Sequence, residues 1–430
     1  MKFTAAGDAI IQKRIYPDYE GYSELTPFIE QGDARFFNLE TTLNHEGTTC
    51  ASQFSGGTYI RTNPEVLDDL KKLGFNMTSF NNNHVLDFSY GGLETTLKAV
   101  EESGLVHAGV GRNLAAAAAP RYLETKNGRV ALIAVNSTFN APMMAGEQSP
   151  LYPGRPGING LRKESYVELP QEDLDIIKRI AKDTNINVAT EIIRKEGYYA
   201  ELAPDEAEFG SLKFKAGETA KVVTTINEAD IKRVEKAIYE AKFQADYIMI
   251  SVHSHELSGD AKENPSQFLI DFAHRCIDAG ADAIVGHGPH LLRPVEIYKG
   301  CPIFYSLGDF ILQLYSVESA PDDFFTKHGL TSQSTVHELL KNRSKNFTVG
   351  LMEDPRMFRA VIPYWETDEN NKLTRLLFMP VEMSMKGNKS EQGLPRRAYT
   401  PEIFEYYKKM SEPYGTKLTL RDDGIIECQL

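Results

Sequence analysis

The chain of 430 residues contains 41% hydrophobic and 25% charged residues, proportions that are ordinary for a globular protein and exclude a disordered or fibrous chain. Its formal net charge of −13 argues against binding along a nucleic-acid backbone, which needs a basic surface. The four widely spaced cysteines contain no CxxC pair, which excludes a zinc ribbon and indicates free thiols in a reducing compartment.

The sequence shows no signal for export or membrane insertion. The first residues, MKFTAAGDAI, lack the apolar core and the small-residue cleavage site of a signal peptide. No apolar run approaches the roughly 20 residues needed to span a bilayer. We therefore expect a cytoplasmic protein without a membrane segment.

Short apolar runs alternate with amphipathic stretches of helix length, which is the pattern of an α/β fold. In chain order we expect strands at residues 2–6, 34–37, 76–80, 130–135, 247–252, 283–285 and 302–305. Helices are expected at residues 64–73, 93–103 and 266–279, and the alanine run at 115–119 is expected to start another.

Two segments interrupt this alternation. Residues 140–245 include the turn-rich sequence YPGRPGING and then charged helical sequence, so we expect an insertion there. Its charged part, residues 172–195, is expected to form either a lid or a solvated outer face. Beyond it, apolar runs at 359–367 and 373–382 joined by DENN predict a hairpin, followed by a terminal helix and a strand-like tail.

These boundaries predict two parts. Residues 1–340 are expected to form a catalytic domain that carries the insertion. Residues 341–430 are expected to pack on this domain or to close its core.

Polar side chains follow five of the expected strands. In open α/β sheets, ligands bind outside the carboxyl ends of the strands, so we expect these side chains to converge. Each has an ordinary structural interpretation as well: an aspartate often caps a helix, asparagines favour turns, and a single buried histidine is usually a hydrogen-bonded core residue. In chain order they are Asp8, Glu40, Asn83 with His84, His253 with His255, and His287 with His290.

The coincidence of these groups indicates a metal centre. Without a cation, neighbouring carboxylates repel each other and several imidazoles must stay neutral in a dry cleft. Mn²⁺, Fe and Zn²⁺ accept carboxylate, amide and imidazole ligands. We therefore expect two divalent ions, and a metal pair with a bridging carboxylate favours phosphoester hydrolysis. The expected ligands are Asp8, Glu40, Asn83, His253, His287 and His290.

The ordered series of motifs resembles the calcineurin-like metallophosphoesterase superfamily and, within it, the bacterial poly-γ-glutamate capsule biosynthesis protein family. The similarity covers most of residues 1–310. The motifs that carry it are, in chain order, GD, which is followed by Arg14, then NLE, NNNHxxD, VHSHE, GHGPH and YSLGDF. The resemblance implies a layered α/β/β/α sandwich with an inserted helical segment and a C-terminal extension.

The resemblance also implies which ligands bind each of the two metal ions. Glu40 would bridge the two metals, Asp8 and His290 would complete one site, and Asn83, His253 and His287 would complete the other.

Further roles are implied for residues beside the ligands. His84 would stabilise or protonate the leaving group, Asp87 would orient His84, and His255 would contact the substrate or support a ligand. Arg14, and Arg155 in the turn PGRPG, are expected to bind an anionic substrate, either a small molecule or an oligomer.

The sequence departs from these families in four places. The usual Asp-x-His of the first motif is Asp8-Ala9-Ile10 here, so the first site lacks an imidazole and is expected to hold its metal more weakly. The fourth motif reads His253-Ser254-His255, where many relatives have a tryptophan and a glycine after the first histidine. The spacing in GHGPH is one residue longer than in the superfamily. The membrane anchor or export signal that is common in the capsule family is not found.

Three functions compete. The first expectation is a metal-dependent hydrolase, foremost a phosphoesterase, with a metal-bound hydroxide as nucleophile. The second is hydrolysis or transfer at amide or γ-glutamyl bonds in polymer or peptide metabolism. The third is a non-enzymatic capsule assembly component with a structural or degenerate metal site.

Overall fold

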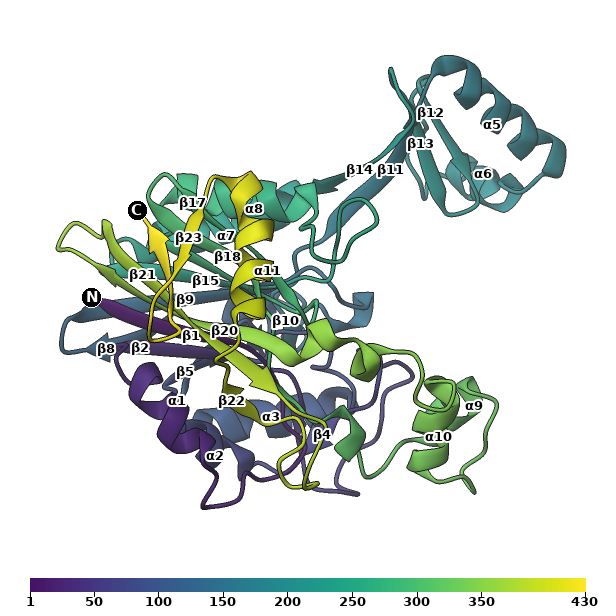
Figure 1. Cartoon of the computed structure of the whole chain (residues 1–430). Coiled ribbons are helices and arrows are strands. Elements are labelled where there is room, and N and C mark those ends of the chain that lie inside the picture. Colours follow the sequence, from purple (N-terminus) through teal and green to yellow (C-terminus); the bar gives the residue numbers. More distant parts are fainter. The chain divides into compact units, whose positions relative to one another are not determined.

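The computed structural model describes residues 1–430 and divides them between two units (Figure 1). Unit 1 comprises Met1–Leu161 and Ile231–Leu430, and unit 2 comprises Arg162–Asp230. Unit 2 is shorter at both ends than the insertion expected at residues 140–245. The C-terminal residues 341–430 lie within unit 1.

The first sheet of unit 1 has ten strands in the order β23-β24-β21-β20-β1-β2-β5-β6, with β19 paired to β1 and β22 to β21. Strands β2 and β19 run parallel to β1, whereas β20 runs antiparallel to it, so the C-terminal hairpin extends a sheet that the N-terminal strands begin. The strands are β1 (Lys2–Ile10), β2 (Ala34–Leu39), β5 (Met77–Ser79), β6 (Val106–Ala108), β19 (Asp309–Leu312), β20 (Arg359–Thr367), β21 (Leu373–Met383), β22 (Pro395–Arg397), β23 (Lys417–Leu420) and β24 (Ile426–Gln429).

The second sheet of unit 1 has six strands in the order β17-β18-β16-β15-β9-β8. Its inner strands are parallel and its two outer strands are antiparallel to their neighbours. The strands are β8 (Arg121–Thr125), β9 (Gly128–Asn136), β15 (Tyr247–His253), β16 (Ala283–His287), β17 (Leu292–Tyr298) and β18 (Cys301–Leu307). Two short pairs, β3 (Thr42–Leu43) with β4 (Arg61–Thr62) and β7 (Val110–Gly111) with β10 (Gly157–Ile158), complete the unit.

The helices expected at residues 64–73, 93–103 and 266–279 are present, and several further helices were not expected. Helix α8 (Gln267–Ala279) is capped by the hydroxyl of Ser266 and ends at Gly280 in the left-handed region, which confirms the helix expected at 266–279. None of the helices has the length and apolar composition to cross a membrane. The others are α1 (Gly21–Ile29), α2 (Val66–Lys72), α3 (Ser89–Ser103), α4 (Leu114–Ala118), α7 (Glu228–Ala241), α9 (Asp322–Lys327), α10 (Val336–Arg343) and α11 (Pro401–Ser411).

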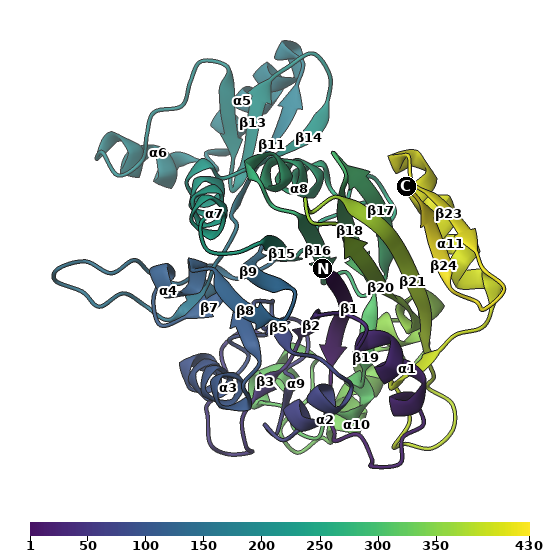
Figure 2. The ribbon, with the colours of Figure 1, turned by 90° about the vertical axis from the view of Figure 1, so that its left-hand side faces the viewer.

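A buried cluster of apolar side chains joins the two sheets. Phe3 and Trp365 of the first sheet pack in it with Val285 and Phe304 of the second, and the indole of Trp365 donates a hydrogen bond of 2.9 Å to the hydroxyl of Tyr247. Figure 2 shows β1 and β20 beside β16 and β18. Burial of this surface holds the strand ends of both sheets close together.

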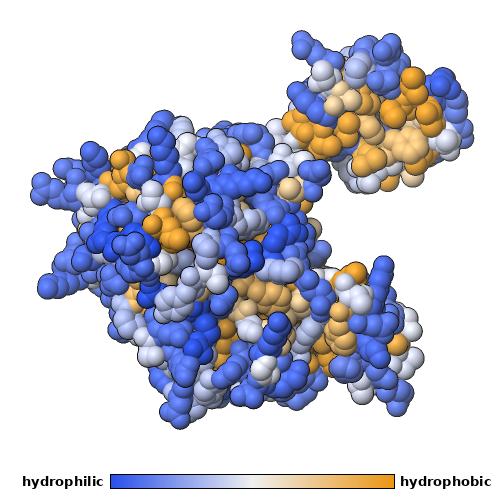
Figure 3. Space-filling model, in the orientation of Figure 1, coloured by the Kyte–Doolittle hydropathy of each residue, from blue (hydrophilic) through white to orange (hydrophobic).

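Unit 2 has its own sheet, in the order β12-β13-β11-β14, and a small core around Leu174 and Phe214. The helix expected at residues 172–195 is two helices, because Asn185 adopts a left-handed conformation with φ of 55° and ends the first. Figure 3 shows apolar side chains on the surface of this unit. Its exposed large side chains include Ile192 and Tyr198. The elements are β11 (Lys163–Leu169), α5 (Gln171–Thr184), α6 (Val188–Lys195), β12 (Glu206–Phe209), β13 (Leu212–Ala216) and β14 (Lys221–Ile226).

Candidate metal centre

Asp8 lies within β1 and not beyond its end, because β1 continues to Ile10. The prediction that this strand ends at residue 6 is therefore wrong. Pairing with β19 extends the strand, and Gly7 permits it, because a Cβ atom at Gly7 would meet the carbonyl oxygen of Gly308 at 1.8 Å. The carboxylate of Asp8 accepts hydrogen bonds from Asn38 Nδ2 at 2.7 Å and from the Gly288 amide at 2.8 Å.

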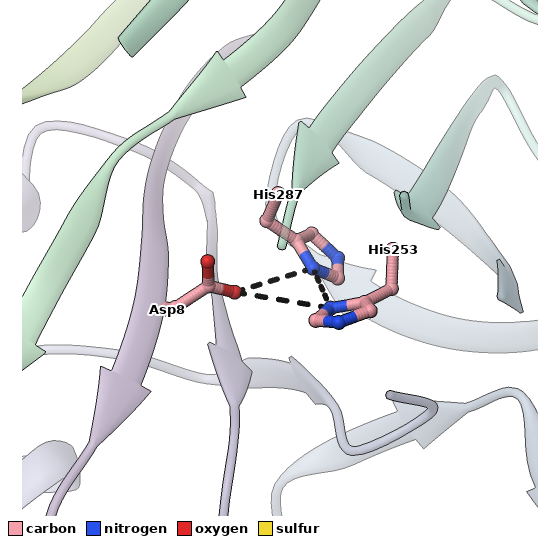
Figure 4. Close-up of side chains that lie close together, drawn as sticks. All are labelled: Asp8, His253 and His287. Atoms are coloured by element: carbon pink, nitrogen blue, oxygen red, sulfur yellow. Dashed lines mark hydrogen bonds and ion pairs between the residues drawn. The ribbon is translucent and has the colours of Figure 1, made fainter. Parts of the chain in front are cut away.

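Two imidazoles lie against Asp8. His253 and His287 are the last residues of β15 and β16, and they face each other in the register of the parallel pair. Their Nδ1 atoms lie 3.0 Å apart, at 4.0 and 3.4 Å respectively from Asp8 Oδ1 (Figure 4). All three side chains are completely buried. The hydroxyl of Ser251, 2.8 Å from His287 Nε2, holds that ring in place.

Glu40 lies directly after β2 and is also completely buried. Its Oε1 atom is 3.7 Å from His84 Nε2 and 3.9 Å from Nε2 of both His253 and His290. Neither carboxylate oxygen has a hydrogen-bond partner. Burial, and then the neighbouring Asp8 carboxylate, raise the pKa of Glu40 well above its ordinary value. A buried carboxylate with no partner is costly, and a cation beside it removes that cost.

The protein shifts the pKa values of the two central carboxylates in opposite directions. Burial acts to raise the pKa of Asp8, but the hydrogen bond from His287 and the neighbouring imidazoles outweigh it and lower that pKa. Burial also lowers the pKa of His253 well below its ordinary value and that of His255 to about 3. Neutral imidazole is the form that binds a metal ion. Burial therefore holds His253 and His255 in the form that binds a metal ion, whereas Glu40 has to lose its proton to bind one.

Two further oxygen atoms are buried without a hydrogen-bond partner. Asn83 donates its amide to the Gly56 carbonyl at 2.8 Å, which leaves Oδ1 without a partner. Asp309 Oδ1 lies 3.0 Å from His290 Nδ1, and Oδ2 has no partner. Burial raises the pKa of Asp309 to about 6. Asp309 is not among the predicted ligands, although it stands in the motif YSLGDF.

The expected ligands fall into groups of convergent atoms. The ligand atoms within each of three groups lie within 4.8 Å of one another. His255, expected to contact substrate or support a ligand, belongs to one group, and its Nε2 is 3.0 Å from His253 Nε2. Oxygen and imidazole donors together suit a divalent transition metal. The groups are Asp8 with His253 and His287, Glu40 with His253 and His255, and Asp8 with His290 and Asp309.

His84 lies beside this centre, and Asp87 orients its imidazole ring. Its Nδ1 lies 2.7 Å from Asp87 Oδ2, and the Asp87 carboxylate accepts the backbone amides of Gly56 at 2.9 Å and Ile60 at 3.0 Å. A Cβ atom at Gly56 would come within 2.7 Å of the imidazole, so a glycine is needed there. A cavity of about 360 Å³ opens onto His84, His255 and His290.

Arg14 and Arg155 are not brought to this cavity. Arg14 donates from Nε and Nη2 to the Asp69 carboxylate at 2.6 and 2.9 Å. Arg155 donates from Nε and Nη2 to the Met144 carbonyl at 3.2 and 3.0 Å. Both guanidinium groups therefore bond within the protein, and a role in binding substrate stays a prediction for them.

Sequence comparisons give this centre a family context. Residues 2–314 match the family described as bacterial capsule synthesis protein PGA_cap. The chain is 31% identical to the uncharacterized protein y4sH of Sinorhizobium fredii, over 97% of this chain and 91% of that protein.

Two further relatives have names that refer to polymer synthesis. Identity is 24% to the capsule biosynthesis protein CapA of Bacillus anthracis, over 70% of this chain and 55% of that protein. It is 26% to the probable polyglutamine synthesis accessory protein MT0602 of Mycobacterium tuberculosis, over 65% of this chain and 55% of that protein. The match over residues 2–314 shows that this chain belongs to the bacterial capsule synthesis protein family PGA_cap.

Proposed function

We propose that this chain is a metal-dependent hydrolase of phosphoesters, built on the layered α/β/β/α sandwich of the calcineurin-like phosphoesterases. The observation that carries the proposal is Glu40, a completely buried carboxylate with two unpartnered oxygens, 3.7–3.9 Å from Nε2 of three histidines. Such a group fits a site for divalent cations.

These side chains would hold two ions, and the family resemblance assigns Glu40 to both of them; Asp8 belongs to two of the three convergent groups. Asp8 and His290, with Asp309 behind His290, fit the first ion. Asn83, His253 and His287 fit the second, and His255 is close enough to join them. When bound, divalent ions supply Lewis-acid stabilisation of phosphoryl oxygens and lower the pKa of water from 15.7 toward about 7.

The protein's own groups position these ligands and move a proton. Asn38 and the Gly288 amide hold the Asp8 carboxylate, and Ser251 holds the His287 ring. The Asp87 carboxylate accepts the Nδ1 proton of His84, so in the imidazolium form of His84 the proton on Nε2 is the one that would pass to the leaving oxygen. The buried walls exclude water around these groups and strengthen their interactions with a developing charge.

The proposal is tested by metal-stimulated turnover of simple phosphoesters. Protein treated with EDTA and dialysed is assayed with p-nitrophenyl phosphate and bis-p-nitrophenyl phosphate after addition of Mn²⁺, Fe²⁺ or Zn²⁺. We expect turnover only with metal, and its loss in Glu40→Ala and His253→Ala. His274→Ala is the matched control, because His274 stacks on Tyr298 and lies outside the ligand groups. Full activity in both ligand variants would refute the proposal.

Hydrolysis or transfer at γ-glutamyl bonds is the second candidate. The names of two relatives, a capsule biosynthesis protein and a probable polyglutamine synthesis accessory protein, favour it. Lewis-acid stabilisation of a tetrahedral oxyanion would serve that reaction as well. A panel of γ-glutamyl peptides assayed beside the phosphoesters separates the two, and turnover of phosphoesters alone removes this candidate.

A further inference from the structure

The cavity over the metal centre contains three cationic side chains and no carboxylate among its lining residues. Lys262, Arg293 and Arg343 line it together with His84, His255 and His290. The chain as a whole has a net charge of −13, so this accumulation of positive charge is the opposite of its average surface. A cavity of one charge sign concentrates ligands of the opposite sign.

A second cavity of this chain is lined by cationic side chains that are paired with carboxylates. The cavity of about 390 Å³ that begins at Gln12 is also lined by three cations. Each of them pairs with a carboxylate: Lys13 with Glu318 at 3.9 Å, Arg14 with Asp69 at 2.6 Å and Arg61 with Glu46 at 3.4 Å. Lys262, Arg293 and Arg343 make no ion pair within 4.0 Å, so their charges are available to a ligand.

Arg293 supplies a fixed positive charge at the wall of the cavity. Its side chain is completely buried, and its nitrogens donate to the carbonyls of Lys262 at 2.9 Å and of Ser254 and His255 at 3.4 Å. Burial lowers its pKa to about 10, so it stays charged at neutral pH. Its hydrogen bonds go only to carbonyl oxygens, although the Glu256 and Glu263 carboxylates also act on its charge, and an anion in the cavity would add to this compensation. Arg293 is thus a positioning residue for Lys262 and His255.

Arg343 and Lys262 supply the groups that can contact a ligand. Arg343 ends α10, donates from Nη1 to the Thr58 hydroxyl, and lies 5.9 Å from the centre of the Phe324 ring. These contacts hold the guanidinium in place while Nε and Nη2 make no hydrogen bond within the protein. The Lys262 ammonium is exposed and also makes no hydrogen bond. A planar guanidinium with free donors suits a carboxylate or a phosphate.

We propose that Arg343 and Lys262 form an anion subsite beside the metal centre, and that the substrate therefore carries a second anionic group next to the bond that is cleaved. The shared chemistry of that group is an oxyanion, either a carboxylate or a phosphate. The identification of the ligand as a substrate rests on the proposed function. The subsite itself is a property of the metal-free protein and can be measured without turnover.

Binding to metal-free protein tests the subsite directly. Isothermal titration calorimetry in EDTA measures the affinities of glutarate and inorganic phosphate for the full chain. We expect the wild-type protein to bind at least one of them, and Arg343→Gln and Lys262→Gln each to weaken that binding about 10-fold, the loss of one charge-assisted hydrogen bond. Lys341→Gln removes the same charge from the same helix outside the cavity and should leave the affinity unchanged.

The outcomes separate the alternatives. The anion that binds more tightly identifies the second group as a carboxylate or a phosphate. Because Lys262 is exposed, Lys262→Gln keeps the test valid if Arg343→Gln disturbs α10. Equal affinity in wild type, Arg343→Gln and Lys262→Gln, or binding of neither anion by the wild-type protein, would overturn the proposal.

Turnover of a matched pair then links the subsite to the substrate. Glycerol 3-phosphate and 3-phosphoglycerate differ by one carboxylate at the far end of the molecule. We expect Lys262→Gln and Arg343→Gln to lower kcat/KM for 3-phosphoglycerate at least 10-fold more than for glycerol 3-phosphate, which lacks the second anionic group. If neither ester is turned over while the variants still lose anion binding, the proposed phosphoesterase function fails and the anion subsite stands. An equal loss on both esters contradicts the subsite.

Discussion

Replacement of Glu40 by glutamine should stabilise the metal-free protein and abolish its response to metal. Glu40 is completely buried, both of its carboxylate oxygens lack a partner, and burial with the Asp8 and Asp309 carboxylates raises its pKa well above 4.5. When folding raises the pKa of an acid, that acid contributes to the stability of the folded state at pH values below its unfolded pKa. This contribution is lost as the pH rises through the pKa of the folded state. Wild-type protein without metal therefore carries this destabilisation at pH 8, and Glu40→Gln does not.

The magnitude follows from the missing partners. A buried polar group without a hydrogen-bond partner destabilises a fold by about 1–3 kcal/mol, and a charged one by more. Glu40→Gln should therefore raise the free energy of unfolding in EDTA by about 1–3 kcal/mol at pH 8, and by less at pH 5. Metal at 100 times its dissociation constant should stabilise the wild-type protein by about 2.7 kcal/mol and the variant by much less.

The assay uses the single tryptophan of the chain. Trp365 is completely buried in the core that joins the two sheets, so its fluorescence reports unfolding of unit 1. Denaturant titrations of wild type and Glu40→Gln at pH 5 and pH 8, with EDTA or with Mn²⁺, give the four comparisons required. A variant that is less stable than wild type in EDTA at pH 8, and that gains as much from Mn²⁺ as wild type does, would refute the reasoning.

Three further predictions concern His84 and a distant histidine. Gly56→Ala places a Cβ atom within 2.7 Å of the His84 ring and should lower kcat at least 10-fold with little change in circular dichroism; wild-type kcat would contradict the geometry. Asp87→Asn removes the negative charge that supports a protonated His84, and kcat should fall on the order of 10²-fold in steady-state assays, whereas unchanged kcat would exclude His84 as the proton donor. Burial, with a smaller effect of Arg121, lowers the pKa of His107 from 6.5 to about 4. Stability is therefore lost as pH falls below 6.5, by about 2 kcal/mol at pH 5, and His107→Gln should remove that part of the loss in denaturant titrations at pH 7 and pH 5.

The local order of the fold was readable from the sequence. Alternating and continuous apolar runs marked most strands of the two sheets, and the DENN turn correctly predicted the hairpin of β20 and β21. The pairing of β20 with β1 was not predictable, because it joins residues about 360 positions apart through backbone hydrogen bonds that leave no local pattern. The sheet of unit 2 was missed because its strands are short and rich in charged residues, as in KESYVEL.

The convergence of the candidate residues was predictable because they lie near the carboxyl ends of strands, and its details required the structure. His253 and His287 become neighbours only through the register of β15 and β16. Asp8 lies inside its strand because the pairing of Asp8 with Asp309 extends β1. Asp309 was not predicted as a ligand because it begins a strand and does not follow one. This strand, β19, starts after the turn at Gly308, which has a φ of 77°. The partners of Arg14 and Arg155 lie in loops that no sequence pattern predicts.

The most direct test of the metal centre is calorimetric titration of Mn²⁺ and Zn²⁺ into protein that has been stripped of metal with EDTA and dialysed. We predict saturable binding of at least one ion per chain to the wild-type protein, its loss in His253→Ala, and its retention in His274→Ala, whose imidazole bonds to Glu296 outside the ligand groups. Absence of binding in the wild-type protein, or equal binding in His253→Ala, would contradict the assignment of this cluster as a metal centre.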